Sequence, residues 1–179
     1  MKELRTKRLI LRSWTLADAA DLFEYAKLST VGPLAGWKPH ENIDESREII
    51  KNFMQAGNIW AIEHREDQKV IGSVGLHFYK RGQNPGAREL GYVLSTKYEH
   101  QGLMTEACRE VLRHTFSETE IDTVYVCHFL ENHKSQRVIE KCGFAFVEDR
   151  DYQSKDNRIL KSRHYMLTKD QYFSNGGER

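Results

Sequence analysis

The sequence predicts a mixed α/β (α+β) fold with one central sheet, and two observations lead to this class. Strand-like segments follow one another between residues 59 and 94. Further along, helical and strand-like segments alternate, as they do in crossovers between strands of one sheet. A length of 179 residues favours a single domain, over residues 1–173, and the small polar residues 174–179 predict a flexible tail.

Cap residues and apolar spacing place the individual elements. The segment from Leu4 to Trp14 is predicted to be a strand. Thr15 can cap a helix that continues through Ala26, and Asp44 can cap a second helix that ends at Gly57. The remaining pattern predicts strands at 59–62, 70–78 and 90–94, a helix at 102–116, a strand at 124–126, a helix at 135–142 and strands at 144–147 and 164–167. About four helices would then flank the sheet.

Composition excludes several classes of function. A net charge of +1 gives no basic field for a nucleic-acid partner. The longest apolar runs are too short to span a membrane, and no apolar signal core follows the charged N-terminus, so a cytoplasmic protein is expected. The three cysteines and eight histidines lack the spacing of metal ligands, and no metal is predicted.

The segment from Glu89 to Ala107 is the most informative for chemistry. A strand ends, a polar loop follows, and a helix begins around Gly102. Backbone N–H groups at the positive end of a helix dipole suit a phosphate or diphosphate. Neither the P-loop nor the Rossmann glycine pattern is present. A plain strand-to-helix turn would also have this pattern, so the segment alone leaves both interpretations open.

A second segment, Asn132 to Phe144, makes the first more specific. Asn132 is a good N-cap, and Gly143 is a good helix stop before the next strand. Alone, this too is only a capped helix. The two segments are separated by one helix and one strand, and together they are a much more specific signal than either one.

These motifs resemble the GNAT superfamily of N-acetyltransferases, and more narrowly the bacterial ribosomal-protein N-terminal acetyltransferases. The resemblance extends from Arg8-Leu9-Ile10-Leu11-Arg12 to the final strand. It depends most on Gly91-Tyr92-Val93-Leu94, Gly102-Leu103-Met104-Thr105-Glu106-Ala107 and Asn132-x-x-Ser135 through Lys141-x-Gly143-Phe144. It implies a GNAT-like, mostly antiparallel sheet with a splayed strand pair. It also implies acetyl-CoA as the acetyl donor, an amine as the acceptor and, as in many relatives, a homodimer.

The resemblance also implies which residues bind acetyl-CoA. The strand Tyr92, Val93 and Leu94 would pair its backbone with the pantetheine arm. The arm would also receive a hydrogen bond from Asn132, and the hydroxyl of Ser135 would lie near the thioester sulfur. The loop amides that would hold the diphosphate belong to His100, Gln101, Gly102, Leu103, Met104 and Thr105.

Three positions depart from the pattern of the superfamily. Glu99 stands where the loop often begins with Gln or Arg, and its side chain would not help to bind an anion. Met104 stands at the last position of the loop motif, where it is common in this branch. Ile139 replaces the tyrosine that many members use to protonate the leaving thiolate, which leaves Ser135 as the candidate for that role.

The reaction also needs a proton acceptor, because only a neutral amine attacks a thioester. Glu89 is the first choice for this base, and His77 or a water molecule is the alternative. The non-catalytic readings of the same two residues are a surface or paired carboxylate for Glu89 and a core or edge histidine for His77. A backbone N–H near Leu94 would stabilise the oxyanion.

The acceptor is the least constrained part of the prediction. Its groove would be formed by residues 25–54 and 149–160, which contain Trp37, His40, Tyr152, Lys155, Asp156 and Arg158. The leading hypothesis is an acetyl-CoA-dependent N-acetyltransferase that acts on a protein N-terminal α-amine. A polyamine, amino acid or aminoglycoside is the second hypothesis for the acceptor. A CoA-binding module without turnover is the third reading.

Overall fold

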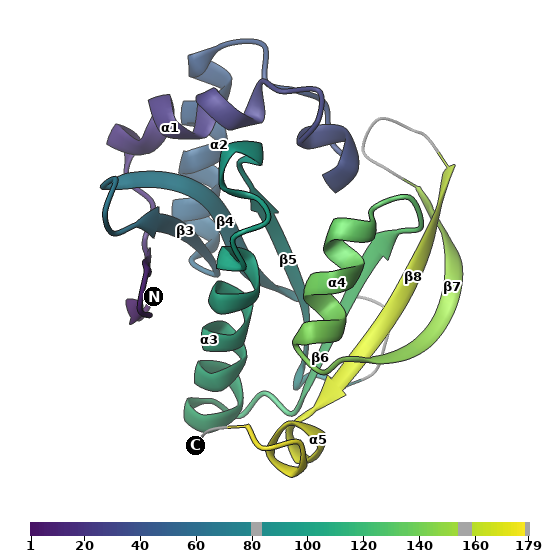
Figure 1. Ribbon diagram of the computed structural model, residues 1–179. Helices are drawn as coiled ribbons and strands as arrows, with labels where there is room; N and C mark the ends of the chain where they lie inside the picture. The colour runs from purple at the N-terminus through teal and green to yellow at the C-terminus, as the bar shows by residue number, and fades with distance from the viewer. Residues whose placement is uncertain (80–83, 154–158, 178–179) are drawn as a thin grey trace. The chain divides into compact units, whose positions relative to one another are not determined.

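The computed structural model describes residues 1–79, 84–153 and 159–177 (Figure 1). Its strands are β1 (Leu4–Arg5), β2 (Leu9–Arg12), β3 (Ile59–His64), β4 (Lys69–Phe78), β5 (Ala87–Leu94), β6 (Thr123–Phe129), β7 (Ala145–Gln153) and β8 (Ile159–Thr168). Its α-helices are α1 (Ala19–Ala26), α2 (Ile43–Ala56), α3 (Leu103–Glu118), α4 (His133–Lys141) and α5 (Lys169–Ser174).

One sheet has the strand order β1-β2-β3-β4-β5-β6-β8-β7. Strands β5 and β6 run parallel, whereas the pairs β1–β2, β2–β3, β3–β4, β6–β8 and β7–β8 run antiparallel. The predicted mixed α/β class with one mostly antiparallel sheet is therefore confirmed. The described residues contain five α-helices rather than about four, because the last strand leads into the short helix α5.

The chain forms two compact units. The first comprises Met1–Gly75 with Tyr92–Ala107, and the second comprises Leu76–Gly91 with Cys108–Arg179. Strands β4 and β5 and helix α3 each continue from one unit into the other. None of the helices in the described residues is long and apolar enough to cross a membrane.

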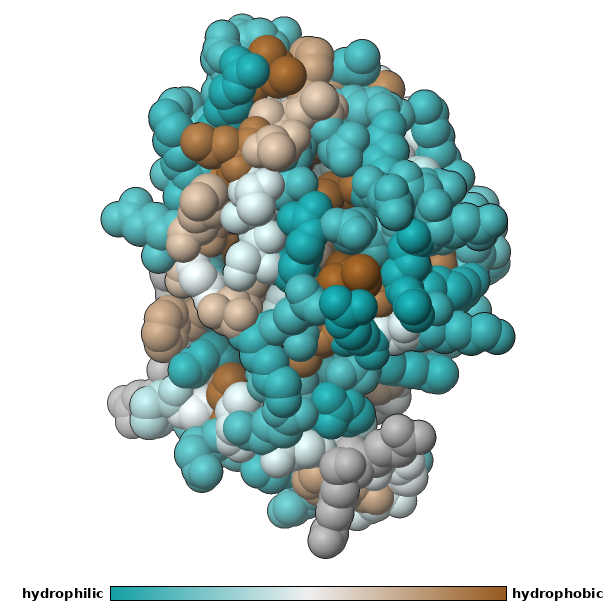
Figure 2. Space-filling model, turned by 90° about the vertical axis from the view of Figure 1, so that its left-hand side faces the viewer, coloured by the Kyte–Doolittle hydropathy of each residue, from teal (hydrophilic) through white to brown (hydrophobic). Residues whose placement is uncertain are grey.

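The first unit has a core built from α1, α2 and the adjoining strands. Trp14, Leu22, Tyr25 and Ile50 are among its buried residues, and the partly buried Val93 of β5 packs against this cluster. The face drawn in Figure 2 is mostly hydrophilic, and its hydrophobic residues form smaller groups, as is usual for a protein surface.

The prediction of one strand from Leu4 to Trp14 is wrong. The N–H of Thr6 donates to the carbonyl of Leu9 over 3.0 Å, and this turn separates β1 from β2. The two strands then pair antiparallel, with Leu4 opposite Leu11. The polar residues 6–8 provide the turn, and Trp14 lies beyond β2 in the helical core.

The predicted cap of α2 is also wrong by two residues. Asn42 has an extended backbone, and its Oδ1 accepts a hydrogen bond from the N–H of Glu45 over 2.9 Å. Asp44 lies in the first turn instead and pairs with Arg47. The predicted end is confirmed, because Gly57 is the C-cap, with φ of 64°.

The second unit contains the crossover elements. Strand β5 pairs with β6 in parallel, from Ala87 opposite Thr123 to Glu89 opposite Tyr125. Strand β8 lies between β6 and the edge strand β7. The fully buried side chains here come from α3, α4, β6 and β8, and they include Val111, Leu112, Phe116, Val124, Ile139 and Leu167. The helices predicted at 102–116 and 135–142 are thus confirmed with small shifts at their ends.

The cap of α2 gives a stability prediction. Replacing Asn42 by Ala removes the acceptor for the N–H of Glu45 and should lower the free energy of unfolding by about 1 kcal/mol. Asp44→Ala is the matched control in the same turn, and it should cost only about 0.3 kcal/mol, because it loses a helix-dipole contact and an exposed ion pair. Urea unfolding of both variants measures the difference. A larger loss in Asp44→Ala would contradict this assignment of the cap.

Candidate functional site

The turn between β5 and α3 has an unusual backbone. After β5 ends at Leu94, residues Thr96–Tyr98 form a 3-10 turn. His100 and Gly102 then have positive φ angles of 62° and 76°. The helical hydrogen-bonding pattern begins where the N–H of Glu106 donates to the carbonyl of Gly102 over 3.0 Å. The N–H groups of residues 103–105 therefore belong to the first turn of α3, which suits an anion.

Position 102 requires glycine because of its backbone conformation, and not because a side chain would lack room there. A Cβ added there would meet only the Nη2 of Arg8 within 4 Å, at 3.9 Å. The left-handed backbone, however, is strained for any residue with a Cβ. The opposite holds at Gly72 of β4, where an added Cβ would lie 2.3 Å from the carbonyl oxygen of Val93. Gly72 thus permits a close approach of β4 to the end of β5.

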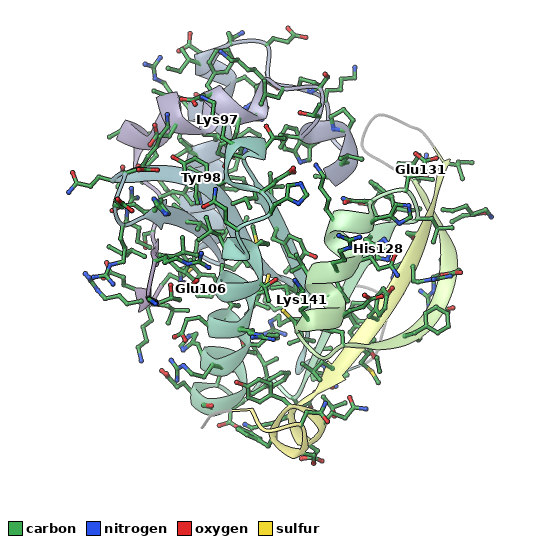
Figure 3. The ribbon with its side chains drawn as sticks, in the orientation of Figure 1. Lys97, Tyr98, Glu106, His128, Glu131 and Lys141 are labelled. Atoms are coloured by element: carbon green, nitrogen blue, oxygen red, sulfur yellow. The ribbon has the colours of Figure 1, made fainter. Side chains whose placement is uncertain are left out.

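Two contacts hold the 3-10 turn that precedes this loop. The Nζ of Lys97 donates to Oε1 of Glu24 on α1 over 2.7 Å, and Lys69 of β4 donates to the other oxygen. The hydroxyl of Tyr98 donates to Oδ2 of Asp67 over 2.6 Å, and this hydrogen bond raises the pKa of Tyr98 to about 12. Figure 3 labels Lys97 and Tyr98. The loop that begins at Glu99 therefore starts from a fixed position in the first unit.

Asn132 and Ser135 lie together at the start of α4, in the second unit. The Oδ1 of Asn132 accepts a hydrogen bond from the N–H of Ser135 over 3.1 Å, which confirms the predicted N-cap. Both side chains are half-buried. The amide oxygen of Asn132 thus serves the helix, and a donor for a ligand would have to come from its amide nitrogen.

Glu89 is a half-buried residue of β5 in the second unit. The thiol of Cys127 on β6 donates to its Oε1 over 3.7 Å. Cys127 is opposite His164 of β8, and the Nε2 of His164 lies 2.9 Å from the hydroxyl of Ser162. A row of polar side chains therefore continues from Glu89 across one face of this part of the sheet.

His77, the alternative base, is exposed at the end of β4 in the same unit. Its Nε2 lies 3.3 Å from the point where a Cβ of Gly91 would be, so its ring lies against the backbone of β5. Of the two non-catalytic readings of His77, a core or an edge histidine, this exposure excludes only the core position.

The residues expected to line an acceptor groove have mixed positions. His40 is buried, its Nδ1 lies 2.8 Å from the hydroxyl of Ser46, and burial lowers its pKa. Trp37 lies beside it, with ring centroids 5.3 Å apart. Tyr152 is half-buried and packs edge-on against Phe129. Lys155, Asp156 and Arg158 lie outside the described residues. His40 is therefore buried and hydrogen-bonded, and its ring is not exposed at the surface of an acceptor groove.

The sequence reasoning missed the contacts that hold the loop. Glu24 and Lys97 lie 73 residues apart, and nothing in the spacing of either one pairs them. The basic residue Lys97, shortly before the loop, was the only feature of the sequence that pointed to such a contact. Within the described residues, no three His, Cys, Asp or Glu side chains gather as a metal site would require.

The contacts of Glu24 give a pH prediction. Hydrogen bonds from Lys69 and Lys97 lower the pKa of Glu24 from 4.5 to about 2. A lowered carboxyl pKa contributes stability that is present above pH 4.5 and is lost as the pH falls towards about 2. Unfolding by urea between pH 2 and pH 6 should therefore show a weaker acid dependence in Glu24→Gln than in the wild type.

Glu48→Gln is the control for this experiment, because Glu48 forms an exposed pair with Lys51 on α2. An equal change of acid dependence in both variants would show that the position of Glu24 between two lysines has no special effect.

Three comparisons relate the chain to known proteins. The family model described as "Acetyltransferase (GNAT) domain" matches residues 8–145. The Bacillus subtilis protein named "Uncharacterized N-acetyltransferase YoaA" is 29% identical over 146 residues, which cover 79% of this chain and 81% of that protein. A second Bacillus subtilis protein, named "Putative ribosomal N-acetyltransferase YdaF", is 29% identical over 116 residues, which cover 65% of this chain and 57% of that protein.

A solved structure from Bacillus anthracis, titled as an acetyltransferase of the GNAT family, has the same fold. It superposes with a TM-score of 0.85 at 20% identity and covers 94% of this chain and 99% of its own. The order of strands and helices described above is therefore the order of a known fold.

Proposed function

The chain belongs to the GNAT acetyltransferases, and we propose that it transfers the acetyl group of acetyl-CoA to a protein N-terminal α-amine. Its relatives are named N-acetyltransferases, and enzymes of this family use acetyl-CoA. The observation that carries the proposal is the strand–loop–helix segment from Tyr92 to Thr105, with its two left-handed residues before α3. The choice of acceptor is supported by the resemblance to ribosomal-protein acetyltransferases and by the name of one relative.

The chain offers groups for each part of the donor. The backbone of Tyr92, Val93 and Leu94 would pair with the pantetheine arm. The N–H groups of His100, Gln101, Gly102, Leu103, Met104 and Thr105 would bind the diphosphate, which carries the negative charge that a helix N-terminus favours. Asn132 would donate from its amide nitrogen to the arm. When bound, acetyl-CoA supplies a thioester whose carbonyl carbon accepts the amine.

Glu89 would act as the general base in this scheme. It would take one proton from the amine nitrogen, directly or through water, as the new C–N bond forms. Its half-buried position on β5 beside the thiol of Cys127 supports this role, because the contact orients one carboxylate oxygen. His77 is the alternative base, and its exposed ring lies against Gly91 of the same strand.

Two further groups would stabilise charge as the C–S bond breaks. A backbone N–H near Leu94 would donate to the oxygen of the acetyl group, where negative charge develops. The hydroxyl of Ser135 would donate a proton or hydrogen bond to the departing sulfur. This assignment is supported by the position of Ser135 in the first turn of α4 and by Ile139, which has no acidic proton to offer.

Substitutions of Asn132 can separate its role as the cap of α4 from its proposed role in binding acetyl-CoA. Asp is as good an N-cap as Asn, so Asn132→Asp should keep the melting temperature but lose the amide donor and bind acetyl-CoA about tenfold more weakly. Asn132→Ala should lose both functions and should also destabilise the fold by about 1 kcal/mol. Thermal unfolding and calorimetric titration with acetyl-CoA measure the two effects. Unchanged affinity in Asn132→Asp would remove Asn132 from the proposed binding site.

The proposed reaction is tested by thiol release from acetyl-CoA. The purified protein is mixed with peptides that differ in their first residue, with the same peptides blocked at the N-terminus, and with polyamines, amino acids and aminoglycosides. Free peptides should release thiol and gain one acetyl group at the α-amine, whereas blocked peptides should not. Turnover with small amines alone would replace the acceptor in the proposal, and binding without any turnover would indicate a CoA-binding module.

Variants of the two proposed catalytic residues complete this test. Glu89→Gln should lower kcat by about 100-fold or more, with an unchanged Kd for acetyl-CoA, because it removes only the base. Ser135→Ala should lower kcat with a similar Kd. Glu140→Gln and Ser174→Ala are the matched controls, because they make the same replacements at exposed residues, and they should leave kcat unchanged. Equal activity of Glu89→Gln and wild type would transfer the role of base to His77 or water.

A further inference from the structure

Arg8 joins the turn between β1 and β2 to the loop before α3, over a separation of more than 90 residues. Its Nη1 donates to the carbonyl oxygen of Gln101 over 2.9 Å. Its Nε and Nη2 both lie 2.7 Å from Oε2 of Glu106. Its own backbone N–H donates to Oε1 of Glu106 over 2.9 Å. All of these residues belong to the first unit.

The hydrogen bond to Gln101 fixes the direction of a peptide plane. The chain has no cis peptide bond among its described residues, so the N–H of Gly102 points opposite to the carbonyl of Gln101. Because Arg8 holds that carbonyl, the N–H of Gly102 is turned away from Arg8. The same plane lies between His100 and α3 and includes Gly102, which as a glycine could adopt several backbone orientations without this contact.

The contacts with Glu106 control a charge at the start of α3. Glu106 is the fourth residue of the helix, and Thr6 donates to its Oε1 over 2.6 Å. Burial alone would raise its pKa, but the hydrogen bonds from Thr6 and Arg8 outweigh burial and hold the pKa below 4.5. The carboxylate is therefore ionised, and Figure 3 labels it on α3. An unpaired negative charge in this turn would repel a diphosphate, and the guanidinium of Arg8 neutralises it.

We infer that Arg8 is a positioning residue for the diphosphate of the donor: it orients the Gln101–Gly102 peptide and neutralises Glu106, without contributing the binding groups itself. This inference rests on the proposed function. It goes beyond that function because it assigns donor affinity to a side chain of the β1–β2 turn. The two contacts of Arg8 act on the same loop, one through geometry and the other through charge.

The test compares two acetyl donors, of which only acetyl-CoA has the 3′-phosphorylated ADP group that includes the diphosphate. S-acetylpantetheine contains only the thioester and the arm. Calorimetry gives the Kd of acetyl-CoA, and competition against acetyl-CoA gives that of S-acetylpantetheine, both with the full chain. Arg8→Gln should weaken acetyl-CoA about tenfold, the usual effect of a lost charge-assisted contact, and should leave S-acetylpantetheine within about twofold.

A set of matched variants separates charge from packing. Arg65→Gln is the control, since Nη1 of Arg65 donates to the carbonyls of Thr6 and Lys7 in the same turn, whereas Arg8 donates to Gln101 and Glu106. Arg65→Gln should leave both affinities unchanged. Glu106→Gln removes the negative charge, so it should bind acetyl-CoA as well as the wild type or more tightly. The double variant Arg8→Gln/Glu106→Gln should regain part of the affinity that Arg8→Gln loses.

Each outcome decides the inference. Equal weakening of both donors by Arg8→Gln, or equal weakening of acetyl-CoA by Arg8→Gln and Glu106→Gln, would show a structural role only and overturn it. If Arg8→Gln does not fold, Arg8→Lys is measured in the same way; it keeps the charge but cannot contact Gln101 and Glu106 together, and it should show a smaller loss for acetyl-CoA alone. Failure of the wild type to bind acetyl-CoA would refute the proposed function, and the inference with it. Binding by the wild type with no selective loss in the variants would refute the inference alone.

Discussion

The turn between β5 and α3 can bind an anion only if its backbone N–H groups are held in one direction. Several side-chain contacts within the first unit meet this requirement. Two left-handed residues, His100 and Gly102, make the turn tight but do not by themselves fix it. Side chains from distant parts of the chain do so. Glu24 of α1 holds Lys97 before the loop, and Arg8 holds Gln101 and Glu106 within and after it.

In the second unit, the same polar side chains stabilise the fold and have roles in the proposed reaction. Asn132 caps α4 through its amide oxygen, and in the proposed function its amide nitrogen would donate to the pantetheine arm. Glu89 lies in a half-buried row with Cys127 rather than in open solvent. Because these side chains also make structural contacts, a substitution there must keep the size and shape of the side chain. Otherwise a loss of activity could come from a disturbed fold.

Local signals in the sequence were sufficient for most of the fold and for part of the site. The cap at Asn132 and the strand–loop–helix order around Gly102 follow from short-range patterns, and the structure confirms them. The N-cap of α2 was misplaced because Asn42 and Asp44 are both good cap residues, and only the backbone conformation decides between them. Burial of His40 and the contacts of Arg8 depend on packing between distant segments, which periodicity does not encode.

The central claim is that the backbone between His100 and Thr105 binds the donor. Amide hydrogen exchange, measured with and without acetyl-CoA under conditions where calorimetry shows binding, tests it most directly. The account predicts that N–H groups in this segment become protected when acetyl-CoA is added, because they donate to the diphosphate. Binding of acetyl-CoA with protection elsewhere and none between residues 100 and 105 would contradict it.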